Sequence, residues 1–185
     1  MTQPQIKRGD LLIACASLLD PNFARTVVLV CDHSDADGTF GLVLNRPVPV
    51  PKEVRDSLPF AVECVYQGGP VREEAMQVIH PYGDKIPQCL QVMEGVWIGG
   101  SFDALCRGFR EGTMDPRRCR FCLGYSGWGG GQLADEFAQD AWLHATATLA
   151  LVFETPADKV WARAVRQCGR SNTLFRFFPD DPGYN

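Results

Sequence analysis

The sequence has no uninterrupted apolar run near the length of about 18 residues that a membrane-spanning helix requires. It has no basic surplus either, since 18 lysines and arginines stand against 22 aspartates and glutamates, for a net charge of -4. Proteins that bind the phosphates of nucleic acids usually carry such a surplus. We therefore expect a soluble protein with no membrane segment and no specific affinity for nucleic acid.

The eight cysteines match neither a disulfide framework nor a complete zinc site. The single CxxC, Cys119 to Cys122, falls within a predicted strand, where a spacing of three puts the thiols on opposite faces. The apolar stretch between Asp10 and Cys15 is four residues long, too short for the core of a secretory signal. We expect reduced thiols, a cytoplasmic location, no metal and no cofactor.

A chain of 185 residues is long enough for one domain with a sizeable core. We expect this domain to span residues 1–169, followed by a polar and aromatic tail over residues 170–185. Strand patterns dominate the first hundred residues, whereas helices alternate with strands only towards the end. This order favours an α+β fold with a largely antiparallel sheet over a doubly wound parallel fold.

Periodicity and turn residues predict the individual elements. Two aliphatic runs joined by DHSDADG predict a hairpin, and the run before Cys15 predicts a short buried strand. Ser101 is expected to cap a helix that runs to Arg110, and Thr155-Pro156 to start the last helix. Further predicted elements are a helix at Lys52–Leu58, a helix from Gln132 with apolar positions as far as Ala145, and strands in VECVY, AMQVIH, CLQVMEGVWIGG, RCRFCLGY and TLALVFE.

The segment GYSGWGGGQL, Gly124 to Leu133, places five glycines around one tryptophan. Glycine loses more freedom on folding than other residues, so such a run needs a positive φ, a close approach of another chain, or a ligand. The segment fails the enzyme templates, because Trp128 replaces the last glycine of a G-x-S-x-G elbow and Gln132 the third glycine of a dinucleotide motif. We assign no catalytic residue to it.

Two interpretations of this segment remain open. In the first, it forms a binding surface with a partly exposed Trp128, and the rim comprises Asn45, Arg46, Ser126, Trp128 and Gln132. In the second, it is a strand-to-helix corner whose tryptophan fills the core. We favour the first, with a protein or a small molecule as the partner.

Direct DNA binding is the main alternative. Arg118 and Arg120 are expected on one strand face, with Arg107 and Arg110 on the preceding helix, but no helix-turn-helix or zinc-finger pattern accompanies them. A solvated basic face explains these arginines equally well.

An enzyme with a pocket at the glycine-rich segment is the third possibility. No nucleophile–base pair can be assigned for it. His80 has no evident partner, and His144, one helical turn after Asp140, is more simply an exposed contact than an acid–base pair.

Several blocks together resemble the AlgH family, also called YqgE: RGDLLIA, GLVLNRP, GGPV, GVWIGG and FCLGYSGWGGGQLADEFAQDAW. The resemblance covers roughly residues 6–165. It implies an α+β fold in which a branched sheet closes into a pseudo-barrel with helices packed around it. It also implies a transcriptional regulator, because the family is named after a regulator of alginate production, and it implies no catalytic residues, since none is established for the family. We expect this regulator to act by binding a partner.

The residues that match the family pattern are Asp20, Phe23, Arg25, His33, Asn45, Arg46, Pro47, Gly68, Gly69, Pro70, Gly124 to Trp128, Gln132, Leu133, Glu136 and Trp142. The chain departs from that pattern at Ala16, where proline is usual, at Ala134, where glutamate is frequent, and in its long tail. We expect a regulator and not an enzyme.

Overall fold

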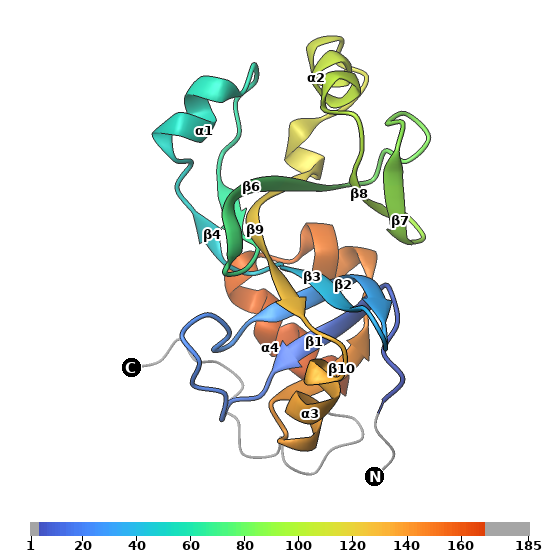
Figure 1. Ribbon diagram of the computed structural model, residues 1–185. Coiled ribbons are helices and arrows are strands. Elements are labelled where there is room, and N and C mark those ends of the chain that lie inside the picture. Colours follow the sequence, from blue (N-terminus) through green and yellow to red (C-terminus); the bar gives the residue numbers. More distant parts are fainter. Residues whose placement is uncertain (1–3, 169–185) are drawn as a thin grey trace.

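Strand β9 (Arg120–Trp128) is shared by the two halves of the sheet (Figure 1). In this computed structural model, which describes residues 4–168, its C-terminal part pairs antiparallel with β3 (Gly38–Val43). The preceding part pairs antiparallel with β6 (Val71–His80) and parallel with β5 (Val65–Gln67). The sheet therefore branches at β9, and the predicted α+β class with a largely antiparallel sheet is confirmed.

The remaining strands are β1 (Asp10–Ala14), β2 (Val27–Ser34), β4 (Pro47–Val48), β7 (Cys89–Met93), β8 (Val96–Gly99) and β10 (Trp142–Thr146). The main path of the sheet runs β10-β1-β2-β3-β9-β6-β8-β7, and β4 pairs with β5. The path curls so that its last strand, β7, contacts β2 near the other end of the sheet. Gly9, just before β1, lies so close to β7 that a Cβ atom on it would be 3.1 Å from Val92 O. The sheet thus forms a half-barrel. The predicted hairpin is β2–β3, and the predicted buried strand is β1.

The helical segments are α1 (Lys52–Ser57), α2 (Phe102–Arg110), η1 (Pro116–Arg118), α3 (Gln132–Ala138), η2 (Ala150–Glu154) and α4 (Ala157–Cys168). Helix α4 packs against β1, β2 and β10, and α3 contacts β3 and β10. Helices α1 and α2 lie at the other end of the molecule from α3 (Figure 1). Ser101 caps α2 as predicted, because its side chain accepts from Ala104 N at 3.3 Å. The predicted tail over residues 170–185 lies outside the described residues.

Two predicted elements were wrong. The helix that begins at Gln132 ends at Ala138, and the apolar residues beyond it form β10, which pairs with β1 in antiparallel register. The segment TLALVFE forms the π-helical turn η2 instead of a strand, closed by two bonds from Thr155 to Ala150 O. A short apolar run does not distinguish a strand from a buried helical turn, and β10 exists because β1 needs a partner along its free edge.

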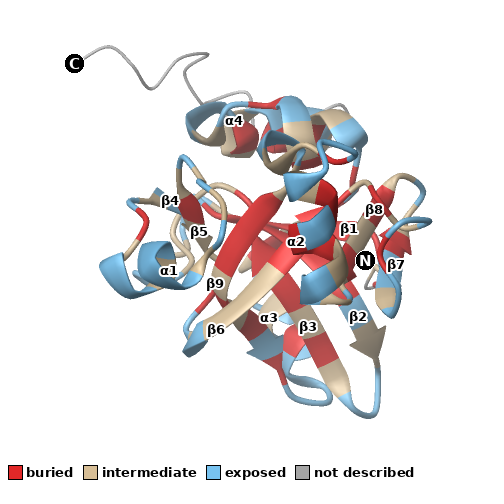
Figure 2. Cartoon of the chain, turned by 90° about the horizontal axis from the view of Figure 1, so that it is seen from above, coloured by how far each residue is buried: buried red, intermediate tan, exposed pale blue. Residues whose placement is uncertain are grey.

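Apolar residues gather on both faces of the sheet, and Figure 2 shows the buried positions concentrated in its central strands. Leu11 and Ile13 belong to the cluster beneath α4, whereas Leu12 belongs to the cluster that contains Trp128. Strand β1 is therefore buried on both faces. A third cluster, around Phe121, packs against α2 and the segment that follows α1.

Arg120, the first residue of β9, is buried with 5% of its surface exposed. Its guanidinium donates to Leu44 O at 2.9 Å, to Val152 O, and to Thr155 O at 3.5 Å, and lies 4.6 Å from the centroid of the Tyr66 ring. The prediction of a basic surface face shared by Arg118 and Arg120 is therefore wrong. Strand alternation alone cannot show that a charged side chain turns inward to carbonyl acceptors.

His80, at the end of β6, is fully buried and has both ring nitrogens occupied. Nε2 lies 3.0 Å from Gly99 O, and Nδ1 lies 3.2 Å from Tyr82 N. Because the carbonyl can only accept and the amide can only donate, the ring is the neutral tautomer with its proton on Nε2. Burial lowers the pKa of His80 below its ordinary value, although the bond to Gly99 O opposes this shift.

We predict that His80 makes the fold less stable in acid. The unfolded chain takes up a proton near the ordinary histidine pKa of about 6.5, at which the folded chain resists protonation. The contribution of His80 is thus complete above that pH and falls as the pH drops below it, by at most about 1.4 kcal/mol per pH unit. Urea denaturation should show that the free energy of unfolding falls more between pH 7.5 and pH 5.5 for the wild type than for His80→Gln. The glutamine amide can still donate to Gly99 O. Equal losses in both proteins would contradict this role.

Candidate functional site

Two of the residues predicted for the binding rim brace the turn that precedes β2. Asn45 Oδ1 accepts from Val27 N at 2.8 Å, and its Nδ2 donates to Arg25 O at 2.9 Å. Arg46 Nη2 donates to Ala24 O at 3.2 Å. Both side chains thus satisfy backbone groups of one neighbouring turn.

The prediction that Trp128 is partly exposed was wrong. Strand β9 continues through Trp128, and Ser126 and Trp128 both lie on its buried positions, with 0% and 4% of their surfaces exposed. Ser126 Oγ donates to Gly68 O at 3.1 Å, and the Trp128 ring lies 5.9 Å from Phe23 and 5.8 Å from Trp142. The expected loop is therefore a strand as far as Trp128.

Glu136 connects the other residues of this motif. Its Oε2 accepts from Trp128 Nε1 at 2.9 Å and from Trp142 Nε1 at 2.7 Å, and its Oε1 accepts from Gln132 Nε2 at 2.9 Å. Gln132 in turn accepts from Gly129 N at 3.1 Å. These contacts fix the corner between β9 and α3. A binding role for Gln132, whose surface is exposed, stays a prediction.

Close approaches of the chain explain two of the five glycines, Gly124 and Gly130, and a positive φ explains Gly131. A Cβ on Gly124, at φ +67°, would lie 2.4 Å from Gly69 O, at the point where β9 branches. A Cβ on Gly130 would lie 2.5 Å from a backbone oxygen of the β2–β3 turn, and Gly131 has φ +81°. Gly129 meets nothing within 4 Å. Backbone packing therefore requires glycine at positions 124 and 130, and the left-handed backbone favours it at Gly131, whereas neither reason applies to Gly127 and Gly129.

A cavity lined by titratable side chains lies elsewhere, between the segment that follows α1 and the turn η1. Its volume is about 530 Å³. The lining residues are Ala61, Val62, Glu63, Cys64, Tyr66, Asp115, Pro116, Arg117, Cys119 and Phe121. Sequence reasoning missed this cavity because its two walls are fifty residues apart and carry no recognised motif. The sole sequence signal was Asp115-Pro116, an ordinary helix start.

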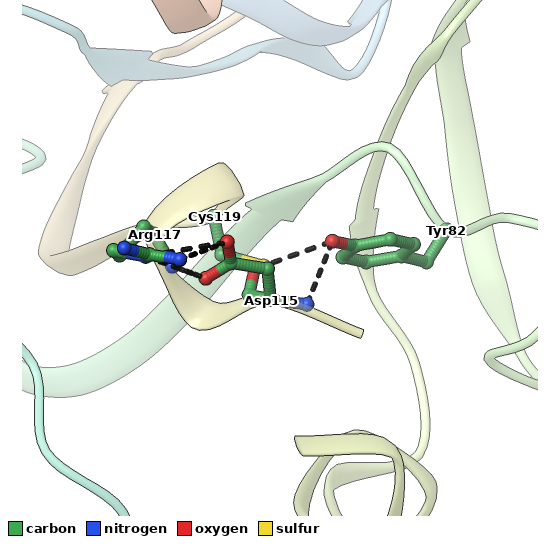
Figure 3. Close-up of polar contacts among 4 residues, drawn as sticks. All are labelled: Tyr82, Asp115, Arg117 and Cys119. Atoms are coloured by element: carbon green, nitrogen blue, oxygen red, sulfur yellow. Dashed lines mark hydrogen bonds and ion pairs between the residues drawn. The ribbon is translucent and has the colours of Figure 1, made fainter. Parts of the chain in front are cut away.

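Asp115 is the fixed point of the cavity wall (Figure 3). Its carboxylate accepts from Arg117 Nε at 3.0 Å, from Arg117 Nη2 at 2.9 Å and from Arg117 N at 2.9 Å. On its other side, Tyr82 Oη accepts from Asp115 N at 2.9 Å and donates to Asp115 O at 3.2 Å. Asp115, the N-cap of η1, is thereby bound to Tyr82 through its backbone and to Arg117 of the turn through its carboxylate.

The charges at this wall are ionised at neutral pH. Hydrogen bonds from Arg117 hold the pKa of Asp115 below its ordinary value. Asp115 raises the pKa of Arg117, and Glu63 adds to that effect through its charge. Glu63 is therefore close enough to the guanidinium to interact with it.

Burial keeps the Cys119 thiol and the Tyr66 phenol of the cavity protonated. Burial raises the pKa of Cys119 to about 12, and burial also raises the pKa of Tyr66, whose hydroxyl is a hydrogen-bond partner of Cys64. Cys122, with a pKa raised by burial to about 12, belongs to the central cluster, whereas Cys119 lies outside the strand and belongs to the cluster around Phe121. The two thiols of the CxxC therefore lie in different parts of the core.

His144 pairs with Asp10 and not with Asp140. Its Nε2 lies 2.9 Å from Asp10 Oδ2, which is within ion-pair distance but is not a hydrogen bond. Asp10 Oδ2 accepts its hydrogen bond from Lys7 N at 3.0 Å. The expected helix does not extend this far, so the strand pairing of β10 with β1 decides the contact. Among residues 4–168, no group of three or more histidine, cysteine or acidic side chains is arranged to hold a metal ion.

We predict that the Trp128–Glu136 cluster is required for stability. Trp128→Ala should cost about 3–5 kcal/mol of unfolding free energy, as for other buried aromatics. Glu136→Ala should cost about 1–3 kcal/mol for each indole N–H left without an acceptor. Chemical denaturation measures both, with Glu74→Ala, at an exposed position outside the cluster, as the control of small effect. A loss below about 1 kcal/mol for Trp128→Ala would contradict the packing described here.

Comparison with known proteins gives consistent matches over the whole chain. A family model described as AlgH-like matches residues 11–173. A UPF0301 protein of Chlorobium limicola is 37% identical over 182 residues, which are 98% of this chain and 97% of that protein. A UPF0301 protein of Bacteroides thetaiotaomicron is 30% identical over 185 residues, which cover 96% of this chain and 91% of that protein.

Solved structures agree with the fold. The solution structure of the AlgH protein from Pseudomonas aeruginosa aligns with a TM-score of 0.72 at 32% identity, over 91% of this chain and 92% of that one. A crystal structure from Corynebacterium diphtheriae aligns with a TM-score of 0.70 at 23% identity, over 94% and 91%, and shows the shared fold alone. Within the described range, no helix is long and apolar enough to cross a membrane. The family match and these identities show that the chain belongs to the AlgH-like family.

Proposed function

We propose that the chain is a regulator in the cytoplasm that acts by binding a small organic molecule, without catalysis, in the cavity between residues 61–66 and η1. The observation that carries this proposal is the cavity itself. Its volume of about 530 Å³ falls within the range of about 300–1,000 Å³ that is usual for small-molecule sites.

The composition of the cavity wall supports binding. Val62, Pro116 and Phe121 supply apolar surface, and the Asp115–Arg117 pair supplies a rigid polar group. Such a combination of apolar lining with few fixed polar groups is typical of ligand sites. A side chain that is already held in place loses little freedom when a ligand binds, which favours affinity.

The absence of an activated group in the wall supports binding over catalysis. A nucleophilic cysteine needs a lowered pKa, whereas burial raises the pKa of Cys119. The Asp115 carboxylate is already occupied by Arg117 and by a backbone amide, so it is a poor general base. Direct DNA binding is less well supported, because Arg120, one of the four arginines considered for it, is buried and cannot reach a phosphate.

The proposal predicts that a side chain which fills the cavity abolishes ligand capture. The full chain, Ala61→Trp and Ala138→Trp are dialysed to equilibrium against a metabolite extract of bacterial cells, and retained compounds are identified by mass spectrometry. Ala61 lines the cavity and Ala138 lies on α3, and both are exposed, so neither change should unfold the protein. We expect the wild type and Ala138→Trp to enrich at least one compound roughly tenfold, as a protein concentration well above the Kd gives, and Ala61→Trp not to enrich it.

Two results would refute the proposal. One is that the wild type enriches no compound. The other is that Ala61→Trp retains the same compounds as the wild type, which would place their site elsewhere.

A further inference from the structure

We propose that the cavity binds a zwitterion of the α-amino-acid type, with its carboxylate on Arg117, its ammonium group at Glu63 and an apolar side chain against Val62 and Phe121. This inference rests on the proposed function and names the chemical class of the ligand. Each of the three contacts is supported by a separate observation.

Arg117 has free donors in a fixed position. A guanidinium carries five N–H groups, and Asp115 occupies the one on Nε and one on Nη2. Three N–H groups are left, and 77% of the side chain is exposed, so the opposite edge of the fork is open to a ligand. The planar guanidinium is held by the Asp115 carboxylate on one edge, and its other edge can donate two parallel hydrogen bonds to the carboxylate of a ligand.

Glu63 supplies an available negative charge beside that fork. It lines the same cavity, it is exposed, and its charge raises the pKa of Arg117. No hydrogen bond or ion pair engages the Glu63 side chain within residues 4–168, in contrast to the Asp115 carboxylate. An ammonium group of a ligand would therefore find Glu63 free, a short distance from the carboxylate bound by Arg117.

The net charge of the lining selects against anionic ligands. Asp115 and Arg117 neutralise each other, so Glu63 leaves the wall with one negative charge at neutral pH. Nucleotides, sugar phosphates and dicarboxylates would be repelled by it, because like charges a few ångströms apart disfavour binding. A zwitterion brings both signs and adds no net charge.

The apolar part of the wall suits the side chain of such a ligand. Val62, Pro116 and Phe121 lie along the cavity, and its volume exceeds that of any single amino acid, so a short peptide with a free amino terminus and carboxylate shares the required chemistry. The Tyr66 hydroxyl and the Cys64 thiol add a neutral polar edge.

Isothermal titration calorimetry with three matched probes tests the assignment. L-phenylalanine carries both charges, phenethylamine lacks the carboxylate and 3-phenylpropanoate lacks the ammonium group. We expect L-phenylalanine to bind at least tenfold more tightly than either probe. Arg117→Gln should weaken L-phenylalanine and 3-phenylpropanoate at least tenfold, and Glu63→Gln should weaken L-phenylalanine and phenethylamine by a similar factor.

Arg118→Gln and Glu74→Gln are the matched controls, because both residues are exposed and neither lines the cavity. They should leave all three affinities unchanged. The twenty standard amino acids and the dipeptide L-leucyl-L-phenylalanine, screened by thermal shift, extend the test to other side chains and to a longer ligand.

Three outcomes would overturn the inference: no amino acid or dipeptide binds, phenethylamine binds as tightly as L-phenylalanine, or the control variants weaken binding as much as Arg117→Gln and Glu63→Gln. If the dialysis experiment then still yields a compound that Ala61→Trp loses, the ligand belongs to another class and the proposed function stands. If dialysis also yields nothing, both fail together.

Discussion

The buried guanidinium of Arg120 is the contact on which the arrangement of the molecule depends. It joins the end of β3 through Leu44 O, the turn before α4 through Val152 O and Thr155 O, and the cavity wall through the Tyr66 ring. Carbonyl dipoles, including those at the C-terminal end of η2, offset the cost of burying this cation, for which residues 4–168 supply no ion-pair partner. Arg120 lies at the start of β9, the strand at which the sheet branches, and its contacts link this strand and the end of β3 to the turn before α4.

A second series of contacts leads from the core to the cavity. His80, locked as a neutral ring, fixes the amide of Tyr82, and the Tyr82 hydroxyl fixes both backbone groups of Asp115. Asp115 then orients Arg117 at the cavity (Figure 3). The exposed guanidinium is thus positioned by buried groups. These successive contacts restrict the motion of Arg117 at the cavity wall. A side chain that is already held in place loses little freedom when a ligand binds, which favours a binding site.

Local signals in the sequence were reliable where the structure is locally determined. The Ser101 cap and the β2–β3 hairpin follow from side chains that bond their own neighbourhood. The burial of Trp128 could not be deduced, because it depends on Glu136, Phe23 and Trp142 meeting around its ring in the folded protein. Strand β10 and the inward turn of Arg120 likewise depend on partners distant in sequence. The cavity was unpredictable for the same reason, since its two walls meet only in three dimensions.

The central claim is that ligands bind at the cavity and that the glycine-rich corner is architecture. Hydrogen–deuterium exchange of the full chain, with and without a metabolite extract, tests it directly. The account predicts added protection at residues 61–66 and 115–121, with no change at residues 129–136. Added protection confined to residues 129–136, with none at the cavity walls, would contradict it.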